Sequence, residues 1–184
     1  TQEHLRSLSS VTVLDEGAIT TVAGLRIAGT GDQQFTPWRS TGSGTAAEKA
    51  ALAQAFDAAD AVLAEAVNAS EARGEPVHVV AVHRRPLAER LHGVVPLVLD
   101  GHTHRRRTAV HDGTLRLTQG STGGAGVRCL ETPEGQEPYP LCATVLRLDP
   151  AGALSDVEEV TVGGLGHRWA RVEHLDAEQT RARA

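Results

Sequence analysis

The chain has 184 residues, a length that fits one domain with a sizeable core. Its formal net charge of −5 and its pI near 6.0 argue against general binding of nucleic acid, and no apolar run approaches the roughly 20 residues of a membrane span. Aromatic residues make up only 3% of the chain, so Val, Leu and Ala must supply most of the core.

The first half of the chain combines short predicted strands with one long helix. Residues 11–14 are predicted to form a strand, and residues 19–27, interrupted by an Ala-Gly pair, are predicted to form a hairpin. A helix is predicted over residues 45–72, because apolar residues recur there at three- to four-residue spacing and form one stripe. Thr45 and Glu48 have the spacing of a capping box in its first turn.

Two predicted strands each end in histidine. The β-branched apolar run over residues 77–82 is followed by His83, and the apolar run over residues 94–99 is followed by Gly101-His102-Thr103-His104. A short helix predicted over residues 86–93 lies between them, and the order strand, helix, strand implies parallel neighbours. The carboxyl ends of such strands meet at one edge of the sheet, where open α/β sheets bind ligands. Since imidazole is the commonest metal ligand, the three histidines predict a metal site there.

The second half of the chain is predicted to be mostly antiparallel β-structure. Residues 108–111 and 114–118 flank Asp112-Gly113, a pair typical of a two-residue hairpin turn. Residues 143–148 and 154–162 form a second predicted pair, and the tail from Gln179 onward is expected to be frayed. The fold class is therefore α/β in the broad sense (α+β), with a mixed sheet and antiparallel hairpins.

The two histidine-bearing segments resemble the last two motifs of the calcineurin-like metallophosphoesterases, and segments 31–37 and 118–126 resemble the bacterial branch of that family. The resemblance implies a four-layer α-β-β-α sandwich that hydrolyses phosphate mono- or diesters at a dinuclear metal centre. It implies that His83 and His102 bind one ion and that His104 binds its neighbour. The two divalent ions would be Mn, Fe or Zn, since mixed nitrogen and oxygen ligation suits all three.

The first three motifs of the family are absent from this chain. They are Asp-x-His, Gly-Asp-x-x-Asp and Gly-Asn-His followed by an acid, and Gly31-Asp32 is followed by neither the histidine nor the second aspartate. Two metal ions need carboxylates to hold them about 3.5–4 Å apart, so the chain supplies only part of the dinuclear site. Because it starts at Thr1 and contains no Met, residues 1–184 are expected to be the C-terminal portion of a single metallophosphoesterase domain. The missing N-terminal half, or another chain, would complete the sheet and supply the catalytic residues, and this chain alone would be inactive.

A non-catalytic role is the alternative. The chain would then be a truncated module that binds at most one metal ion weakly, or a scaffold. Two other metallohydrolase classes fit less well. A metallo-β-lactamase needs an Asp and a His after the His-x-His motif, where this chain has Arg105-Arg106, and an amidohydrolase barrel usually needs about 250 residues.

The residues around the histidines have structural explanations as well as functional ones. Asp100 is either an acceptor for an imidazole N–H or a cap of the turn. Arg84-Arg85 and Arg105-Arg106-Arg107 could meet an anionic substrate, but a solvated surface is the expectation for both runs. The polar loop over residues 32–44 either borders the site or is a packing loop, and its residues of interest are Asp32, Phe35 and Trp38.

Cys129 and Cys142 are the only cysteines, and their spacing matches no zinc motif. If the segments that flank them pair, the two sulfur atoms would come within bridging range. The alternative is two free thiols. A disulfide would imply an oxidising compartment, so both the pairing and the localisation are left open by the sequence.

Overall fold

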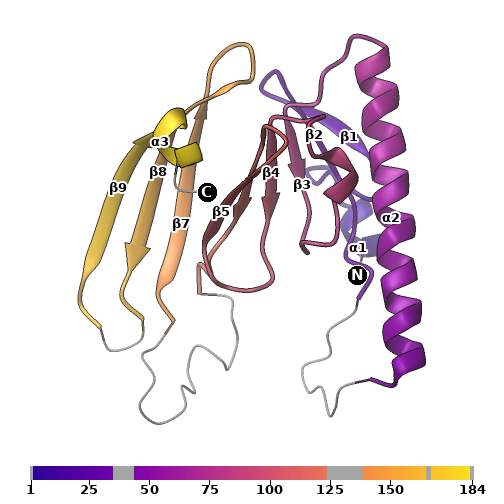
Figure 1. Ribbon diagram of the computed structural model, residues 1–184, viewed down its shortest axis with the longest axis horizontal. Helices are drawn as coiled ribbons and strands as arrows, with labels where there is room; N and C mark the ends of the chain where they lie inside the picture. Colours follow the sequence, from indigo (N-terminus) through magenta and orange to yellow (C-terminus); the bar gives the residue numbers. More distant parts are fainter. Residues whose placement is uncertain (1, 35–43, 124–138, 165–166, 183–184) are drawn as a thin grey trace.

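The computed structural model describes residues 2–34, 44–123, 139–164 and 167–182, which form two β-sheets and a few helices (Figure 1). Sheet A has the strand order β1-β2-β3-β4-β6-β5, and sheet B has the order β7-β8-β9. The strands of sheet A are β1 (Ile19–Val22), β2 (Leu25–Gly29), β3 (Val79–Ala81), β4 (Leu97–Asp100), β5 (Arg107–His111) and β6 (Thr114–Thr118). Sheet B consists of β7 (Leu141–Leu148), β8 (Leu154–Val162) and β9 (Ala170–Asp176). The helices are α1 (Gln2–Arg6), α2 (Ala46–Ala72), the 3-10 turn η1 (Glu89–Leu91) and α3 (Ala177–Ala182).

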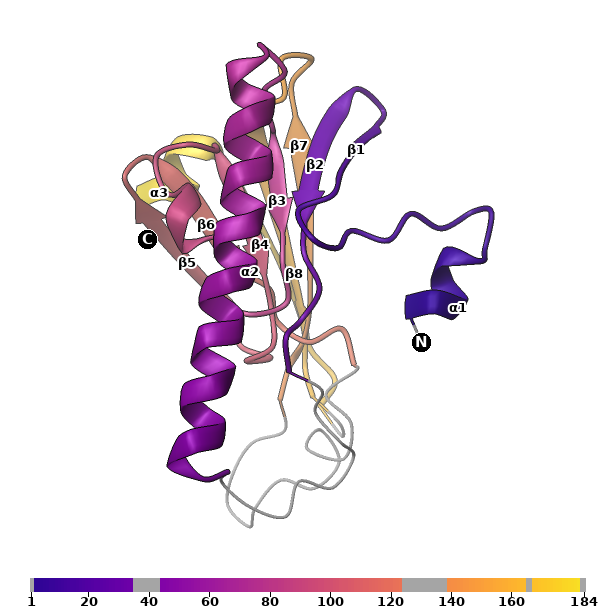
Figure 2. The same ribbon diagram turned by 90° about the vertical axis from the view of Figure 1, so that its right-hand side faces the viewer.

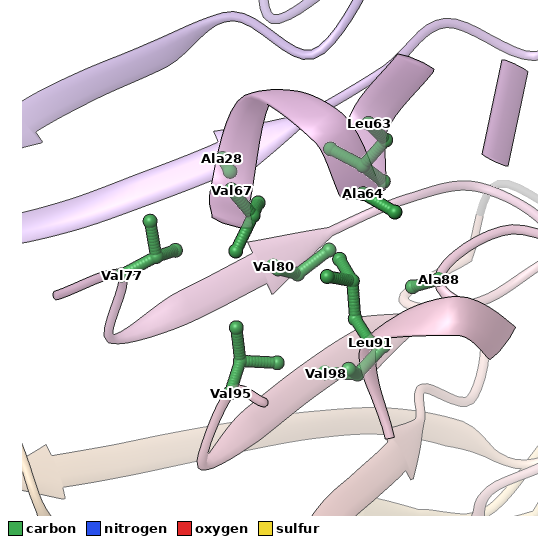
Figure 3. Packing of buried hydrophobic residues seen from close by; sticks show 10 residues of the cluster. All are labelled: Ala28, Leu63, Ala64, Val67, Val77, Val80, Ala88, Leu91, Val95 and Val98. Carbon is green, nitrogen blue, oxygen red and sulfur yellow. The ribbon is translucent and has the colours of Figure 1, made fainter. Parts of the chain in front are cut away.

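Helix α2 lies against one face of sheet A, with buried side chains from Phe56 onward, and its first turns extend past the strands (Figure 2). The predicted capping box begins it: the Glu48 amide donates to Thr45 Oγ1 at 3.2 Å, and the Thr45 amide donates to Glu48 Oε2 at 2.7 Å. Figure 3 shows its apolar stripe against the sheet, where Leu63 and Val67 meet Val80. This burial of aliphatic surface is the main stabilising contribution on that side. Of the described helices, none is long and apolar enough to cross a membrane.

The other face of sheet A packs on sheet B. Leu97, Leu115 and Leu117 of sheet A lie against Leu146 and Leu148 of β7 in a second aliphatic cluster. The three layers are therefore α2, sheet A and sheet B (Figure 1). The predicted class is confirmed, since the fold is a mixed α/β structure with a mixed parallel and antiparallel sheet. The helical layer expected beyond sheet B has no counterpart in the described ranges.

Both predicted two-residue hairpins form in sheet A. Ala23 and Gly24 have φ values of 50° and 86°, and Asp112 and Gly113 have values of 50° and 87°. Two successive left-handed residues match the right-handed twist of the flanking strands, which is why Gly is favoured at the second position. The predicted parallel pair of β3 and β4 also forms. Strands β2 and β6 extend it on either side in the same direction, which was not predicted.

Three predictions of local structure are wrong. Residues 11–14 form no strand, since the neighbouring backbone makes turns instead, with the Val11 amide donating to Leu8 O. The helix predicted over residues 86–93 shrinks to η1, because Ala88 is left-handed with φ of 66° and its amide donates to Asp60 Oδ1 of α2. The tail is ordered as α3, held by the buried Thr180 and by Arg181, which donates to Gly113 O at 2.9 Å.

Two histidines stack at the opposite end of the parallel strands from the histidine motif. The His92 and His111 rings lie 4.6 Å apart at 20°, and each has a buried Nε2 with no partner in the described part of the chain. Burial lowers the pKa of His92; the charges of His111 and Arg116 lower it further, while Glu89 and Asp112 oppose this. The unfolded chain therefore binds a proton on His92 more readily than the folded chain does.

We expect this difference to make the protein less stable as the pH falls through about 6.5, the ordinary value for histidine. The free energy of unfolding should fall by at most about 1.4 kcal/mol per pH unit on account of His92, and His92→Gln should remove that part of the slope. Urea unfolding at several pH values between 7.5 and 5.5 measures it. His174→Gln is the matched control, because His174 is 65% exposed on β9. Equal slopes for the wild type and His92→Gln would contradict the expectation.

Candidate metal centre

Two of the three predicted histidines meet at the carboxyl edge of sheet A. Strands β3 and β4 are parallel with Ala81 opposite Leu99, so the residues that follow them emerge side by side. His102 Nδ1 lies 3.2 Å from His83 Nε2, and the two rings are nearly perpendicular, at 78° with centroids 5.1 Å apart. The Gly101 amide donates to His83 O at 3.2 Å and joins the two loops. The prediction that these two side chains share an edge is therefore confirmed.

A strained turn presents His102 to His83. His102 and His104 have φ values of 67° and 59°, in the left-handed region that non-glycine residues rarely occupy. The Thr103 amide donates to Gly101 O at 2.8 Å and tightens the turn between them. Backbone strain of this kind costs of order 1–3 kcal/mol per residue and clusters at functional sites. Two strained residues, one on each side of Thr103, mark this turn as a candidate functional element.

The environment favours a neutral imidazole at His102. Burial lowers its pKa, and the positive charges of Arg84 and His83 lower it further. The neutral form is the one that binds a metal ion. His83 is 52% exposed, so the pair is open to solvent on one side.

Asp32, from the polar loop that follows β2, also reaches this edge. Asp32 follows β2, which pairs with β3 in parallel, and its Oδ2 lies 3.7 Å from His83 Nε2. The same oxygen accepts from Arg84 Nε at 3.1 Å. Arg84, expected to be solvated, is instead only 15% exposed and lies over the Phe56 ring at 5.9 Å. Of the two roles predicted for Asp32, bordering the site or packing in a loop, the structure shows that it borders the histidine pair.

The spacing of the two imidazoles fits a shared metal ion. Two nitrogens bound at 2.0–2.1 Å to a tetrahedral zinc ion are about 3.4 Å apart, close to the 3.2 Å between His83 and His102. These two nitrogens alone do not make a complete metal-binding group. In the described part of the chain no three or more His, Cys, Asp or Glu side chains are arranged to hold a metal ion. The structure thus provides two converging ligand atoms, not a closed coordination shell.

His104 lies apart from the pair. It lines a separate pocket with Arg105, Tyr139 and Cys142, between the histidine turn and β7. It still contributes to the electrostatics of His102, whose pKa its charge lowers. Its assignment to a second metal ion remains a prediction.

The acid before the motif has a structural role. Asp100 is fully buried, and its Oδ2 accepts from Arg116 Nε at 2.5 Å. Arg116, itself 2% exposed, also donates to the carbonyls of Arg85 and Leu87 at 2.7 Å and 2.9 Å. The pair therefore ties the end of β4, which leads into His102, to the loop that follows His83. Asp100 binds neither imidazole; its Oδ1 is buried with no partner among the residues described.

The arginine run after the motif is only partly solvated, contrary to expectation. Arg106 donates to Ala143 O at 2.8 Å and Val160 O at 3.1 Å, so it joins sheet A to sheet B. Arg105 lies over the Tyr139 ring at 5.5 Å. Phe35, Trp38 and Cys129 lie outside the described residues, so the loop and disulfide predictions that rest on them stay predictions.

Comparison with solved structures finds Vps29 of Entamoeba histolytica in three forms. The wild-type protein complexed with Zn²⁺ matches with a TM-score of 0.39 at 15% identity, a single mutant with 0.37 at 15%, and a double mutant with 0.38 at 16%. Each match covers 92% of this chain and 63% or 65% of the Vps29 chain, so the chain spans less than two thirds of the length of these proteins. No protein-family model matches the chain, and no curated protein matches it significantly.

Proposed function

We propose that this chain is part of a metal-dependent phosphoesterase, in which His83 and His102 bind one divalent ion. The observation that carries the proposal is the 3.2 Å approach of His102 Nδ1 to His83 Nε2 on a strained turn at the carboxyl edge of a parallel sheet. The resemblance of these segments to metallophosphoesterase motifs supports the same assignment. His104 would bind a second ion, and the remaining ligands, carboxylates above all, would come from a further segment or another chain.

The chemistry follows from the ligand types. Divalent Mn, Fe or Zn ions, when bound, neutralise phosphate charge and lower the pKa of a bound water. The residues of this chain prepare that site in three ways. The pKa of His102 is lowered, chiefly by burial, the His83 loop is held by the Arg116 network, and Arg84 with Asp32 places a guanidinium beside the imidazoles. A phosphate mono- or diester is the substrate class that such a site would accept.

Metal binding by histidine variants tests the proposal. We expect His83→Ala and His102→Ala each to weaken Zn²⁺ or Mn²⁺ binding by more than about tenfold. Loss of a residue that only orients a metal ligand already lowers metal affinity about 10–100-fold. Equilibrium dialysis with elemental analysis measures the affinity. His174→Ala is the matched control, because His174 is an exposed histidine on β9, far along the chain from the motif. Unchanged metal binding in both variants would overturn the assignment.

Turnover of p-nitrophenyl phosphate and bis(p-nitrophenyl) phosphate separates the enzyme from its alternative. The alternative is a non-catalytic module that binds one ion weakly or serves as a scaffold, and it is favoured by the lack of a three-residue metal group in the described ranges. Metal binding without turnover by this chain fits both a half-site and the module. Turnover restored by adding the acidic motifs of a completing segment supports the enzyme, whereas its continued absence supports the module.

A further inference from the structure

A second pocket lies next to the histidine turn, on the α2 side of sheet A. It has a volume of about 360 Å³, within the usual range for small-molecule sites. Strand pairing sets its floor: Arg107 is opposite Thr118, and Thr118 is opposite Asp100. Directly opposed residues point to the same face. Arg85 closes the pocket from the loop after β3, because its carbonyl is held by Arg116 at 2.7 Å.

Two arginine side chains of this pocket have no partner among the residues that the structure describes. Neither the Arg85 nor the Arg107 side chain makes a hydrogen bond or ion pair with the residues that the structure describes. The other two arginines of the lining are engaged elsewhere. Arg105 contacts Tyr139, and Arg106 is bound to sheet B. The pocket is therefore lined by two arginines from different segments whose positive charges have no counter-ion among the described residues.

The one acid in the lining does not cancel this charge. Asp100 is paired with Arg116 behind the floor of the pocket, and both side chains are at most 2% exposed. Its charge is thus already matched inside the protein. What remains toward the ligand is the positive charge of Arg85 and Arg107, together with the Thr118 side chain on the floor. Arginine is the residue best suited to phosphate, since its planar fork donates two parallel hydrogen bonds.

We propose that this pocket binds the phosphate group of a small molecule through Arg85 and Arg107, without a metal ion. A phosphate dianion matches two guanidinium charges, and the pocket is large enough to hold part of an attached organic group as well. The site is separate from the histidine pair, because its walls come from the other side of the Gly101–Thr103 turn and include neither His83 nor His102.

Calorimetric titration of the full chain with inorganic phosphate and with ribose 5-phosphate, in the presence of a chelator, tests the proposal. Both should bind, and ribose should not. Arg85→Gln and Arg107→Gln should each raise the dissociation constant roughly tenfold or more, as expected for a lost hydrogen bond between charged groups. Arg107→Lys, which keeps the charge, should bind phosphate more tightly than Arg107→Gln and less tightly than the wild type. Tighter binding of ribose 5-phosphate assigns the site to phosphate esters, and tighter binding of inorganic phosphate assigns it to the free ion.

Arg73→Gln is the matched control, since Arg73 is 58% exposed at the end of α2. An equal loss of affinity in this variant would show general charge attraction and overturn the proposal, as would the absence of phosphate binding in a wild type that is folded by circular dichroism. The chelator keeps the two proposals distinguishable. If the chain binds phosphate but no metal ion, the phosphate site is supported and the metal centre is contradicted. If it binds a metal ion but no phosphate, the metal centre is supported and the phosphate site is contradicted.

Discussion

Replacing Arg116 with methionine is expected to lower the free energy of unfolding by about 3–5 kcal/mol, the cost of leaving a buried charge without its partner. The Asp100 carboxylate is fully buried and would lose its ion-pair partner, whose side chain is 2% exposed. Two backbone carbonyls, of Arg85 and Leu87, would lose their donor as well. Because these carbonyls belong to the loop after His83, metal binding by the histidine pair should also weaken.

Urea unfolding of three variants measures the effect. Arg116→Met should shift the midpoint strongly, and Arg171→Gln, which removes a 67%-exposed ion pair on β9, should cost no more than about 1 kcal/mol. The double variant Asp100→Leu/Arg116→Met should regain much of the loss, because an apolar pair of similar volume replaces a buried ion pair at little cost. A loss below about 1 kcal/mol for Arg116→Met would mean that water reaches Asp100. The ion pair would then not be what holds the end of β4 to the loop after His83.

Leu63→Ala is expected to lower the free energy of unfolding by about 2–5 kcal/mol. Leu63 is fully buried where α2 packs on sheet A, among Ala28, Val67 and Val80 (Figure 3). Its neighbours are held in place in α2 and sheet A, which pack closely on each other. They can therefore close only part of the cavity that the truncation leaves.

The matched control is the residue before it. Val62 is 46% exposed on α2, and Val62→Ala should change stability by less than about 0.5 kcal/mol. Chemical unfolding of both variants gives the comparison. If the two changes were equal, α2 would not be packed against sheet A through the face that Leu63 occupies.

Much of the local structure could be predicted because its causes lie within a few residues. The capping box of Thr45 and Glu48, the Ala23-Gly24 and Asp112-Gly113 turns and the β-branched strands all formed where expected. These signals failed where a distant group intervened. The Asp60 carboxylate of α2 accepts from the Ala88 and Arg90 amides, 28 and 30 positions away, and with Ala88 left-handed only a short 3-10 turn forms where a helix was expected.

The candidate site divides in the same way. That His83 and His102 share one edge follows from the sequence, since a strand-helix-strand order implies parallel strands and parallel strands end together. The approach of Asp32 and the burial of Arg84 do not follow from it. Those two residues are 52 positions apart and pair only because β2 joins the sheet beside β3.

The sequence by itself therefore determined most of the elements, the fold class and the placement of the histidine pair, because helix caps, turns and side-chain periodicity act over short stretches of chain. Only the tertiary structure decided which charges are buried, which arginines are already paired and which, like Arg85 and Arg107, are left free for a ligand among the residues described. The physical reason is that burial and pairing depend on neighbours from other strands. Sequence spacing does not encode them until the sheet has formed.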